Sequence, residues 1–242
     1  MSENAYVDEF LNRDRVQYVD MRNALKSGKA SMFYADEHGV ILMLKKDNIA
    51  MLAADSAEFV KAHIDILEKY DGIIAHSMET AEFLRDHFNI DEKYFECCMQ
   101  MAYFGGPIEI DRPNLEIKRL RMKDLDYVHK HYHRVEELDY IKYRLRAGMY
   151  GAYYCGELAG FIGTHSDGSI GFLEVLPEYR RKGIGSALEA FMFNKYLSKG
   201  LTPYGQVVMG NEGSVQLQKH MNCVAAPDIV AWLFPEVCWK DM

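Results

Sequence analysis

Hydrophobic and polar residues alternate through much of the second half of the chain, and this two-residue period predicts strands buried on one face. Between these strands, apolar residues recur three and four positions apart, which predicts amphipathic helices. In the helix expected over 184–198, for example, Ile184, Leu188 and Phe191 share one side. The predicted order is strand, helices, three strands, helix, strand, helix and strand, over 115–121, 124–148, 150–155, 158–165, 169–176, 184–198, 204–209, 214–221 and 224–234.

The first half predicts the same order of elements without repeating the residues. A helix precedes three short strands, and a helix, a strand, a helix and a long strand complete the set. Ser56 and Ser77 stand where the two later helices are expected to begin. We infer an internal repeat of topology, joined by a linker with Gly and Pro over 105–114. The predicted elements span 6–25, 31–35, 40–44, 49–53, 56–70, 72–75, 77–87 and 94–104.

Composition narrows the classes of function. The 242 residues are 49% hydrophobic, which is enough for a sizeable core and excludes a wholly disordered chain. The net charge of −8 argues against a general nucleic-acid-binding or anionic-membrane-binding protein. No apolar run approaches the roughly 18 residues that cross a bilayer. The N-terminus is polar and acidic and has no signal-peptide pattern, so we expect a cytoplasmic protein.

Neither the cysteines nor the histidines show the spacing of a metal site. An odd number of cysteines in a cytoplasmic chain predicts free thiols. His129, His131 and His133 alternate, but side chains two positions apart diverge on a helix, so we expect no metal there. The five cysteines are Cys97, Cys98, Cys155, Cys223 and Cys238.

The segment 173–188 carries the most informative chemistry. An apolar strand enters the basic turn Arg180-Arg181-Lys182-Gly183-Ile184-Gly185, which continues as a helix. Such a junction directs backbone N–H groups toward one spot at the positive end of a helix, and glycine lets an anion approach the backbone closely. The turn lacks the Gly-Lys-Ser/Thr of a Walker A loop, and Leu188 stands where a dinucleotide fingerprint has Gly or Ala. We therefore expect a phosphate receptor; the alternative is an ordinary helix start with packing glycines.

Two motifs resemble one family. Arg180-x-x-Gly183-x-Gly185 resembles the acyl-CoA pyrophosphate loop of the GNAT N-acetyltransferase superfamily. Asn211-x-x-Ser214-x-x-Leu217-Gln218-Lys219 resembles the family's Asn-x-x-Ser-x-x-Leu-Tyr-x-Lys segment, and 115–240 follows the family's order of elements. The chain is similar to tandem GNAT proteins, including glycine N-acyltransferase-like ones. In the first half Ala53-Ala54-Asp55-Ser56 replaces the loop, and Asp55 would repel a pyrophosphate, so this half should not bind CoA.

The resemblance implies an α/β (α+β) fold of two GNAT-like mixed-sheet halves in tandem, with central antiparallel strands and flanking helices. Its domains would be a degenerate N-terminal domain over 1–104, a linker over 105–114 and an acetyltransferase domain over 115–242. The implied activity is acetyl-CoA-dependent N-acetylation of a small amine or amino acid by direct transfer, with acetyl-CoA as cosubstrate and no metal. The expected partner is a small-molecule amine acceptor, with no nucleic acid and no membrane.

The resemblance also implies how acetyl-CoA is held. Backbone N–H groups of 181–186 would bind the diphosphate, and the main chain of the strand before the turn would pair with the pantetheine arm. Asn211 would orient the pantetheine or cap the next helix, and Ser214 would share the capping role. The expected cofactor-binding residues are Leu173, Val175, Arg180, Arg181, Lys182, Gly183, Ile184, Gly185, Ser186, Asn211 and Ser214.

Glu174 is the candidate catalytic base because it interrupts an otherwise apolar strand. A carboxylate in such a setting loses hydration and becomes a stronger base. The alternatives are that Glu174 binds the acceptor or forms a structural salt bridge. The acid is less clear, since Gln218 stands at the usual Tyr position and an amide cannot protonate a thiolate. Either the thiolate leaves unassisted, or a group such as Tyr204, His220 or Cys223 serves as the acid, or catalysis is weak.

Two other classes of function compete with the enzyme. The absent Tyr favours a non-catalytic acyl-CoA-binding or sensing protein. The first half could instead serve as an interaction surface that makes a homodimer. His165, at the end of a predicted strand, would face the acceptor or serve only as a turn residue.

Overall fold

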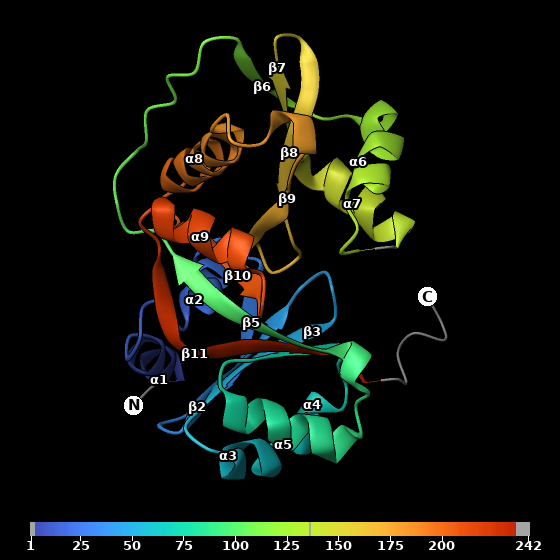
Figure 1. The fold of residues 1–242 in the computed structure, drawn as a ribbon. Coiled ribbons are helices and arrows are strands. Elements are labelled where there is room, and N and C mark those ends of the chain that lie inside the picture. Colours follow the sequence, from blue (N-terminus) through green and yellow to red (C-terminus); the bar gives the residue numbers. More distant parts are fainter. Residues whose placement is uncertain (1–2, 136, 236–242) are drawn as a thin grey trace. The chain divides into compact units, whose positions relative to one another are not determined.

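The computed structural model of the protein describes residues 3–135 and 137–235. The chain forms two compact units (Figure 1). Unit 1 comprises Met1–Ala102, Gln206–Glu212 and Val224–Met242, and unit 2 comprises Tyr103–Gly205 and Gly213–Cys223. The mixed α/β architecture with flanking helices confirms the predicted fold class.

Unit 1 is built on a seven-stranded mixed sheet. Its first three strands form an antiparallel meander, and β4 runs parallel to β3. The strand order is β1-β2-β3-β4-β11-β5-β10. The strands are β1 (Ala30–Ala35), β2 (Gly39–Leu44), β3 (Ile49–Ala54), β4 (Gly72–Ala75), β5 (Phe95–Ala102), β10 (Tyr204–Val208) and β11 (Val224–Leu233).

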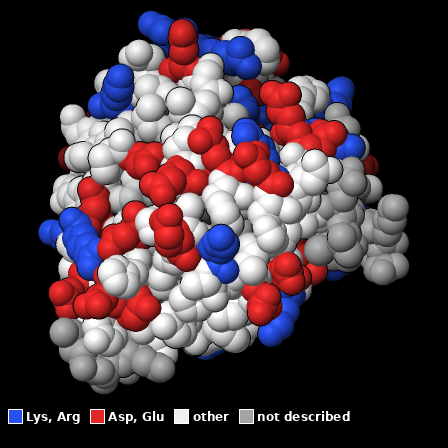
Figure 2. Space-filling view, turned by 90° about the horizontal axis from the view of Figure 1, so that it is seen from below, with Lys and Arg blue, Asp and Glu red and all other residues white. Residues whose placement is uncertain are grey.

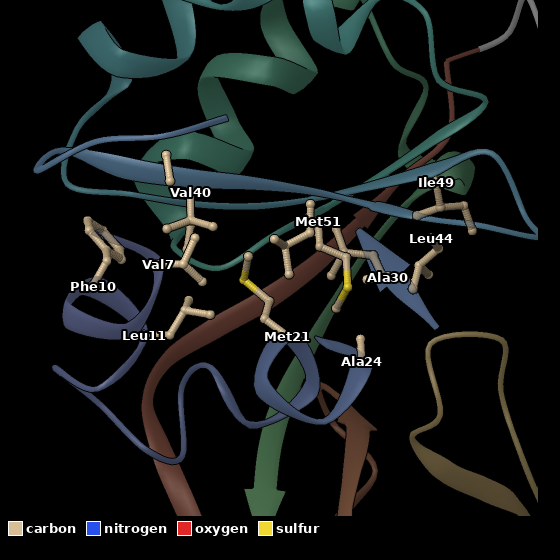
Figure 3. Packing of buried hydrophobic residues seen from close by; sticks show 14 of the residues in the cluster. Val7, Phe10, Leu11, Met21, Ala24, Ala30, Val40, Leu44, Ile49 and Met51 are labelled. Atoms are coloured by element: carbon tan, nitrogen blue, oxygen red, sulfur yellow. The ribbon is translucent and has the colours of Figure 1, made fainter. Parts of the chain in front are cut away.

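Helices cover both faces of this sheet, which explains why its strands are apolar on both sides. On β2, Val40 and Leu44 pack toward α1 (Glu3–Leu11) and α2 (Val19–Lys26), as the close-up of this core shows (Figure 3). Leu42, between them on the strand, belongs to the same core. The next residue toward the N-terminus, Ile41, belongs to the other core, which is covered by α3 (Ala57–Ala62), α4 (Ile64–Leu67) and α5 (Met78–Phe88). The short 3-10 helix η1 (Glu92–Tyr94) leads into β5.

Two helices predicted as continuous are each divided in the structure. The helix expected over 6–25 becomes α1 and α2, because the Asp14 side chain accepts from the backbone N–H groups of Val16 and Gln17, each at 2.8 Å, in a turn between them. The helix expected over 56–70 is interrupted at His63, whose φ of −120° is not helical. Ser77 caps α5 as predicted by accepting from the Thr80 N–H at 3.2 Å.

The last strand lies in the sheet of unit 1, although the sequence analysis assigned 224–234 to the C-terminal domain. β11 pairs antiparallel with β4 and with β5. Val230, Ala231 and Leu233 are fully buried, as the apolar central strand of a sheet must be. Pro227, which has no N–H to donate, falls in the irregular stretch of the β5 pairing between Ala225 and Ile229. Residues 115–242 therefore do not form one compact unit.

Unit 2 contains a four-stranded antiparallel sheet in the order β6-β7-β8-β9. One face packs against α8, and the other packs against α6 and α7 (Figure 1). The predicted helical stretch 124–148 is thus a pair of helices, and α9 begins two residues before the predicted start. The elements are β6 (Leu115–Arg119), η2 (Met122–Asp124), α6 (Leu125–His131), α7 (Leu138–Gly148), β7 (Tyr150–Tyr154), β8 (Glu157–Thr164), β9 (Ile170–Val175), η3 (Pro177–Tyr179), α8 (Ile184–Leu197) and α9 (Glu212–His220).

The surface and the thiols add two observations. Asp and Glu side chains are spread over one face of the molecule, in keeping with the acidic net charge (Figure 2). The four cysteines in the described part, Cys97, Cys98, Cys155 and Cys223, are free thiols, and Cys238 lies outside it.

None of the helices in residues 3–135 and 137–235 is long and apolar enough to span a bilayer.

Candidate active site

The site begins at an irregularity in β9. Phe172 and Leu173 stand together opposite one residue of β8, and Phe172 has a φ of 50°, which marks a β-bulge. Neighbouring side chains here enter different cores, as in any strand: Phe172 is buried with α6 and α7, and Leu173 packs on the side of α8. Beyond the bulge, Glu174 lies opposite Phe161.

The end of β9 presents main-chain groups at the edge of its sheet. Leu176 donates its N–H to the Ala159 carbonyl at 2.9 Å. Because paired and unpaired residues alternate along an antiparallel ladder, Val175 directs its N–H and C=O away from β8. The Arg180 Nε donates to this Val175 carbonyl at 2.9 Å. The chain's own side chain thus uses one of the groups expected to bind the pantetheine arm.

The turn after β9 needs an unusual backbone. Arg181 has a φ of 63° and Gly183, the cap of α8, has a φ of 74°. A Cβ at Gly183 would be strained by this φ and would lie 2.8 Å from Nη2 of Arg112. Gly185 differs, because a Cβ there would meet only Leu217 and Val175, at the ordinary contact distances of 3.6 and 3.8 Å. Packing within the protein does not require glycine at 185, whereas a ligand lying against the backbone would.

Six consecutive backbone N–H groups, those of residues 181–186, have no acceptor among the residues that the structure describes. The first amide in the helical pattern is that of Ala187, which donates to the Gly183 carbonyl at 3.1 Å. Unpaired donors at the positive end of a helix form a receptor for an anion. This geometry is compatible with the diphosphate of an acyl-CoA, and the binding of acyl-CoA by these residues stays a prediction.

Three cations accompany these amides. Arg181 and Lys182 are exposed, and the Lys182 Nζ lies 5.2 Å from the ring centroids of both Tyr154 and Tyr179. Arg112, from the segment predicted as a linker, places its guanidinium beside Gly183. The sequence analysis missed Arg112, because its place beside the turn comes from tertiary structure and no motif marks it.

Glu174 forms an ion pair with Arg180. The Arg180 Nη2 lies 3.1 Å from Oε1 of Glu174, and the Glu174 side chain is 28% exposed. The strong dehydration expected from the apolar strand is therefore absent, because Glu174 follows the bulge at the edge of the sheet and meets a guanidinium. The salt-bridge alternative is present in the structure, and the role of Glu174 as a base stays a prediction.

The three candidate acids differ in their surroundings. Tyr204 is buried and donates its O–H to the Asp167 carbonyl at 3.1 Å. His220 is exposed at the end of α9. Burial, with a smaller contribution from Glu189, raises the pKa of the Cys223 thiol to about 12, so this thiol holds its proton too tightly to protonate a thiolate near neutral pH.

Gln218 contacts a residue that the sequence analysis did not single out. Its Nε2 donates to Oε1 of Glu189 at 2.7 Å, and both side chains are buried. Burial raises the pKa of Glu189 to about 8, and the hydrogen bond from Gln218 opposes that rise. The signal available in the sequence was one acidic residue among the apolar residues of α8.

His165 is a half-buried, neutral side chain. Its ring stacks on Phe172 with centroids 4.7 Å apart, and it lies over Gly171, where a side chain would collide with it. Burial first, and then the charge of Arg144, lowers the pKa of His165 to about 4. Tyr140 places its O–H 3.3 Å from Nδ1. The structure thus favours the turn-residue interpretation of His165.

The second family segment spans the start of α9. Asn211 directly precedes the helix and belongs to unit 1, and its N–H donates to the Val208 carbonyl at 3.0 Å. Ser214, in unit 2, lies inside the first turn because α9 begins at Glu212, so Ser214 does not occupy the cap position.

Comparison with known proteins decides the family of this region. Residues 114–222 match the sequence model of the Acetyltransferase (GNAT) family. This region is a GNAT acetyltransferase domain. The protein is therefore an acyltransferase, as the motifs predicted. No curated protein matches the chain. In residues 3–135 and 137–235, the GNAT domain included, no cluster of three His, Cys, Asp or Glu side chains could hold a metal ion.

Solved structures share the fold of the whole chain and not only that of the GNAT domain. A protein from Drosophila is 17% identical with a TM-score of 0.64, and the alignment covers 97% of each chain. A protein from Novosphingobium aromaticivorans, described as an acetyltransferase of the GNAT family, is 15% identical with a TM-score of 0.51 over 91% of this chain and 96% of that one. A GCN5-related N-acetyltransferase-like protein from Streptococcus suis is 10% identical with a TM-score of 0.50 over 95% and 99%.

Proposed function

We propose that the protein is an acetyl-CoA-dependent N-acetyltransferase that acts on a small amine or amino acid by direct transfer. The observation that carries this proposal is the row of six unpaired amides at 181–186, at the start of α8. Arg112, Arg181 and Lys182 add positive charge for the diphosphate, and the bare backbone at Gly185 leaves room for it.

The arrangement of Arg180 couples substrate binding to the base. Arg180 donates to both the Val175 carbonyl and the Glu174 carboxylate. A pantetheine arm that pairs with the main chain at Val175 competes with Arg180 for this carbonyl. Where it displaces Arg180, it also releases Glu174, which can then accept a proton from the amine. In the transfer, the amine nitrogen forms a bond to the thioester carbon and the carbon–sulfur bond breaks. The amine loses its proton and the thiolate gains one.

Two observations, the family resemblance and the net charge, bear on the identity of the acceptor. The resemblance to tandem GNAT proteins with a glycine N-acyltransferase-like C-terminal domain favours an amino acid or another small amine. The acidic net charge of −8 favours a cationic acceptor over an anionic one. Unit 1 would not bind a second acetyl-CoA, because Asp55 stands at its corresponding junction and pairs with Arg13 at 2.8 Å.

The decisive experiment adds one carbon atom beside the unpaired amides of residues 181–186. Gly185→Ala places a Cβ where the protein makes only ordinary contacts, so the fold should be kept. We expect acetyl-CoA binding, measured by calorimetry, to weaken by about tenfold or more, equivalent to losing roughly one hydrogen bond to a charged group. Gly106→Ala is the control, because that site has open space and no positive φ. Equal affinity in both variants would contradict the proposal.

One observation favours a second candidate, a non-catalytic acyl-CoA-binding or sensing protein. Gln218 stands where the family segment has Tyr, and the structure holds its side chain against Glu189. A panel of amines, with release of the CoA thiol as the readout, separates the two candidates. Release with any amine supports the enzyme, and tight binding of acetyl-CoA without release supports the sensor.

A further inference from the structure

One cavity in unit 2 combines three arginines with three apolar residues. It lies where the end of β6, the start of η2 and the last turn of α7 meet. Its volume is about 270 Å³, near the lower end of the roughly 300–1,000 Å³ that is typical of small-molecule sites. The residues that line it are Arg119, Leu120, Arg121, Met122, Leu145 and Arg146.

The cavity lies at the end of the sheet opposite to the turn before α8. Arg119 pairs with Tyr150 at the start of β7, and Tyr150 pairs with Ile162 late in β8, beside which β9 begins. The turn with the unpaired amides of 181–186 follows the other end of β9. Because β9 has six residues, its two ends are separated by roughly 17 Å. A ligand in this cavity would therefore be distinct from a diphosphate at the start of α8.

The three arginines of this cavity have no carboxylate partner within 4 Å among the residues that the structure describes. Acidic residues on the adjoining elements are engaged elsewhere. Asp139, at the start of α7, pairs with Lys142 at 2.8 Å. Asp124, in η2, directs its Oδ2 to the backbone N–H of Arg121 at 2.7 Å. Like charges that gather without counterions repel one another, so the cluster needs an explanation.

Most of the hydrogen-bond donors of these arginines are unused. A guanidinium group has five N–H donors. Arg119 donates from Nη2 to the backbone carbonyl of Arg146 at 2.9 Å, which holds its guanidinium at the C-terminal end of α7. The side chains of Arg121 and Arg146 donate no hydrogen bond to any residue of 3–135 or 137–235. Arg119 thus has a structural role, whereas the other two guanidinium groups have none of this kind.

The positive charge of this cluster contrasts with the acidic character of the chain. Asp and Glu outnumber Lys and Arg by 36 to 28 in the whole sequence. The stretch 118–123 nevertheless contains four cations and no acid, namely Lys118, Arg119, Arg121 and Lys123. A cleft lined by charge of one sign focuses the electric field and concentrates ions of the opposite sign. The cavity therefore favours an anionic ligand.

A phosphate ester suits this cavity better than a carboxylate. One arginine can satisfy both oxygens of a carboxylate in a bidentate pair. A phosphate group carries roughly 1.5 to 2 negative charges near pH 7 and three acceptor oxygens, enough for several guanidinium groups. The apolar residues of the lining would contact the carbon part of the ester. We propose that the cavity is a binding site for a small phosphate monoester, held by Arg119, Arg121 and Arg146 and separate from the acyl-CoA site.

The test measures the binding of phenyl phosphate by calorimetry. The double variant Arg121→Gln/Arg146→Gln should keep the fold, because neither side chain donates a hydrogen bond in the described part of the chain. We expect its affinity to fall by about tenfold or more. Lys199→Gln, which removes one charge from an exposed residue after α8, is the control and should bind as the wild type does. A loss no greater than that of the control would overturn the site. Benzoate, a carboxylate on the same ring, should bind more weakly, and equal affinity would overturn the phosphate class.

A second comparison separates this cavity from the turn before α8. Gly185→Ala should leave the affinity for phenyl phosphate unchanged, and a loss confined to this variant would overturn the proposal by placing the phosphate at the turn. NMR gives a direct readout, because the Nε–H signals of Arg121 and Arg146 can be assigned from their single Gln variants. Both signals should shift when phenyl phosphate is added, and unchanged signals would overturn the site. A protein that transfers no acetyl group would overturn the proposed function alone, since phosphate binding here does not depend on it.

Discussion

Two junctions between a strand and a helix occupy the same place in the two halves of the chain, and they treat the start of the helix in opposite ways. In unit 1, between β3 and α3, the Ala57 N–H donates to the Glu79 carboxylate at 3.0 Å, and the Asp55 N–H donates to the His38 carbonyl at 2.9 Å. In unit 2, between β9 and α8, the amides of 181–186 have no acceptor in the described part of the chain. One junction supplies a carboxylate to its own amides, whereas the other leaves its amides without an acceptor among the described residues.

The same contrast appears among buried polar groups. In unit 1, both ring nitrogens of His76 are satisfied, by the Leu52 carbonyl at 2.8 Å and by the Asp20 carboxylate at 2.8 Å. Gln100 continues this network with a bond of 3.3 Å to Asp20. In unit 2, the pair of Glu189 and Gln218 keeps two orphan oxygens. Among the described residues, both buried side-chain oxygens that lack a partner therefore belong to unit 2.

The largest expected difference between the two junctions is that only the one in unit 2 carries a catalytic base. The fifth residue of β3 is Ala53, and the fifth residue of β9 is Glu174. We predict that Glu174→Gln lowers kcat by about 10²–10⁴-fold, the usual contribution of a general base, with little change in acetyl-CoA affinity. Steady-state kinetics and calorimetry together check this. Glu178→Gln, an exposed neighbour on η3, is the control. Full activity of Glu174→Gln would leave Glu174 as a structural partner of Arg180.

A smaller effect concerns the cation that joins the turn from the segment before β6. We predict that Arg112→Ala weakens acetyl-CoA binding by about 2–5-fold, because an exposed charge is screened by solvent, and that the difference shrinks as salt rises. Calorimetry at two salt concentrations measures both. Lys123→Ala removes an equal charge from the same unit at η2 and should have less effect. If the two variants weaken binding equally, the contribution is net charge and not the position beside Gly183.

The sequence predicted the elements of both halves in order because their periods and turn residues are local signals. It placed the strand, the basic turn and the helix of the candidate phosphate site for the same reason, since the three are contiguous in the chain; that the turn binds phosphate stays a prediction. The partners that depend on tertiary structure were missed. Because β11 is last in the sequence, the sequence analysis assigned it to the second half. In the structure it is a central strand of the unit 1 sheet, where apolar side chains on both faces are buried. Arg112 lies far along the chain from Gly183, and Glu174 meets Arg180 just after the bulge at Phe172.

The smallest predicted effect tests whether the unit 1 junction is truly closed. Glu79→Gln keeps a hydrogen-bond acceptor for the Ala57 N–H but removes the negative charge at the start of α3. We expect a loss of about 0.3–1 kcal/mol in the free energy of unfolding, the usual value of a charge at a helix end. Because Asp55 still repels a diphosphate there, calorimetry should continue to find a single acetyl-CoA site per chain. A second binding event in this variant would mean that the unit 1 junction can bind a diphosphate once the Glu79 carboxylate is neutralised. The two junctions would then differ only in whether a side chain of the protein already occupies the anion site.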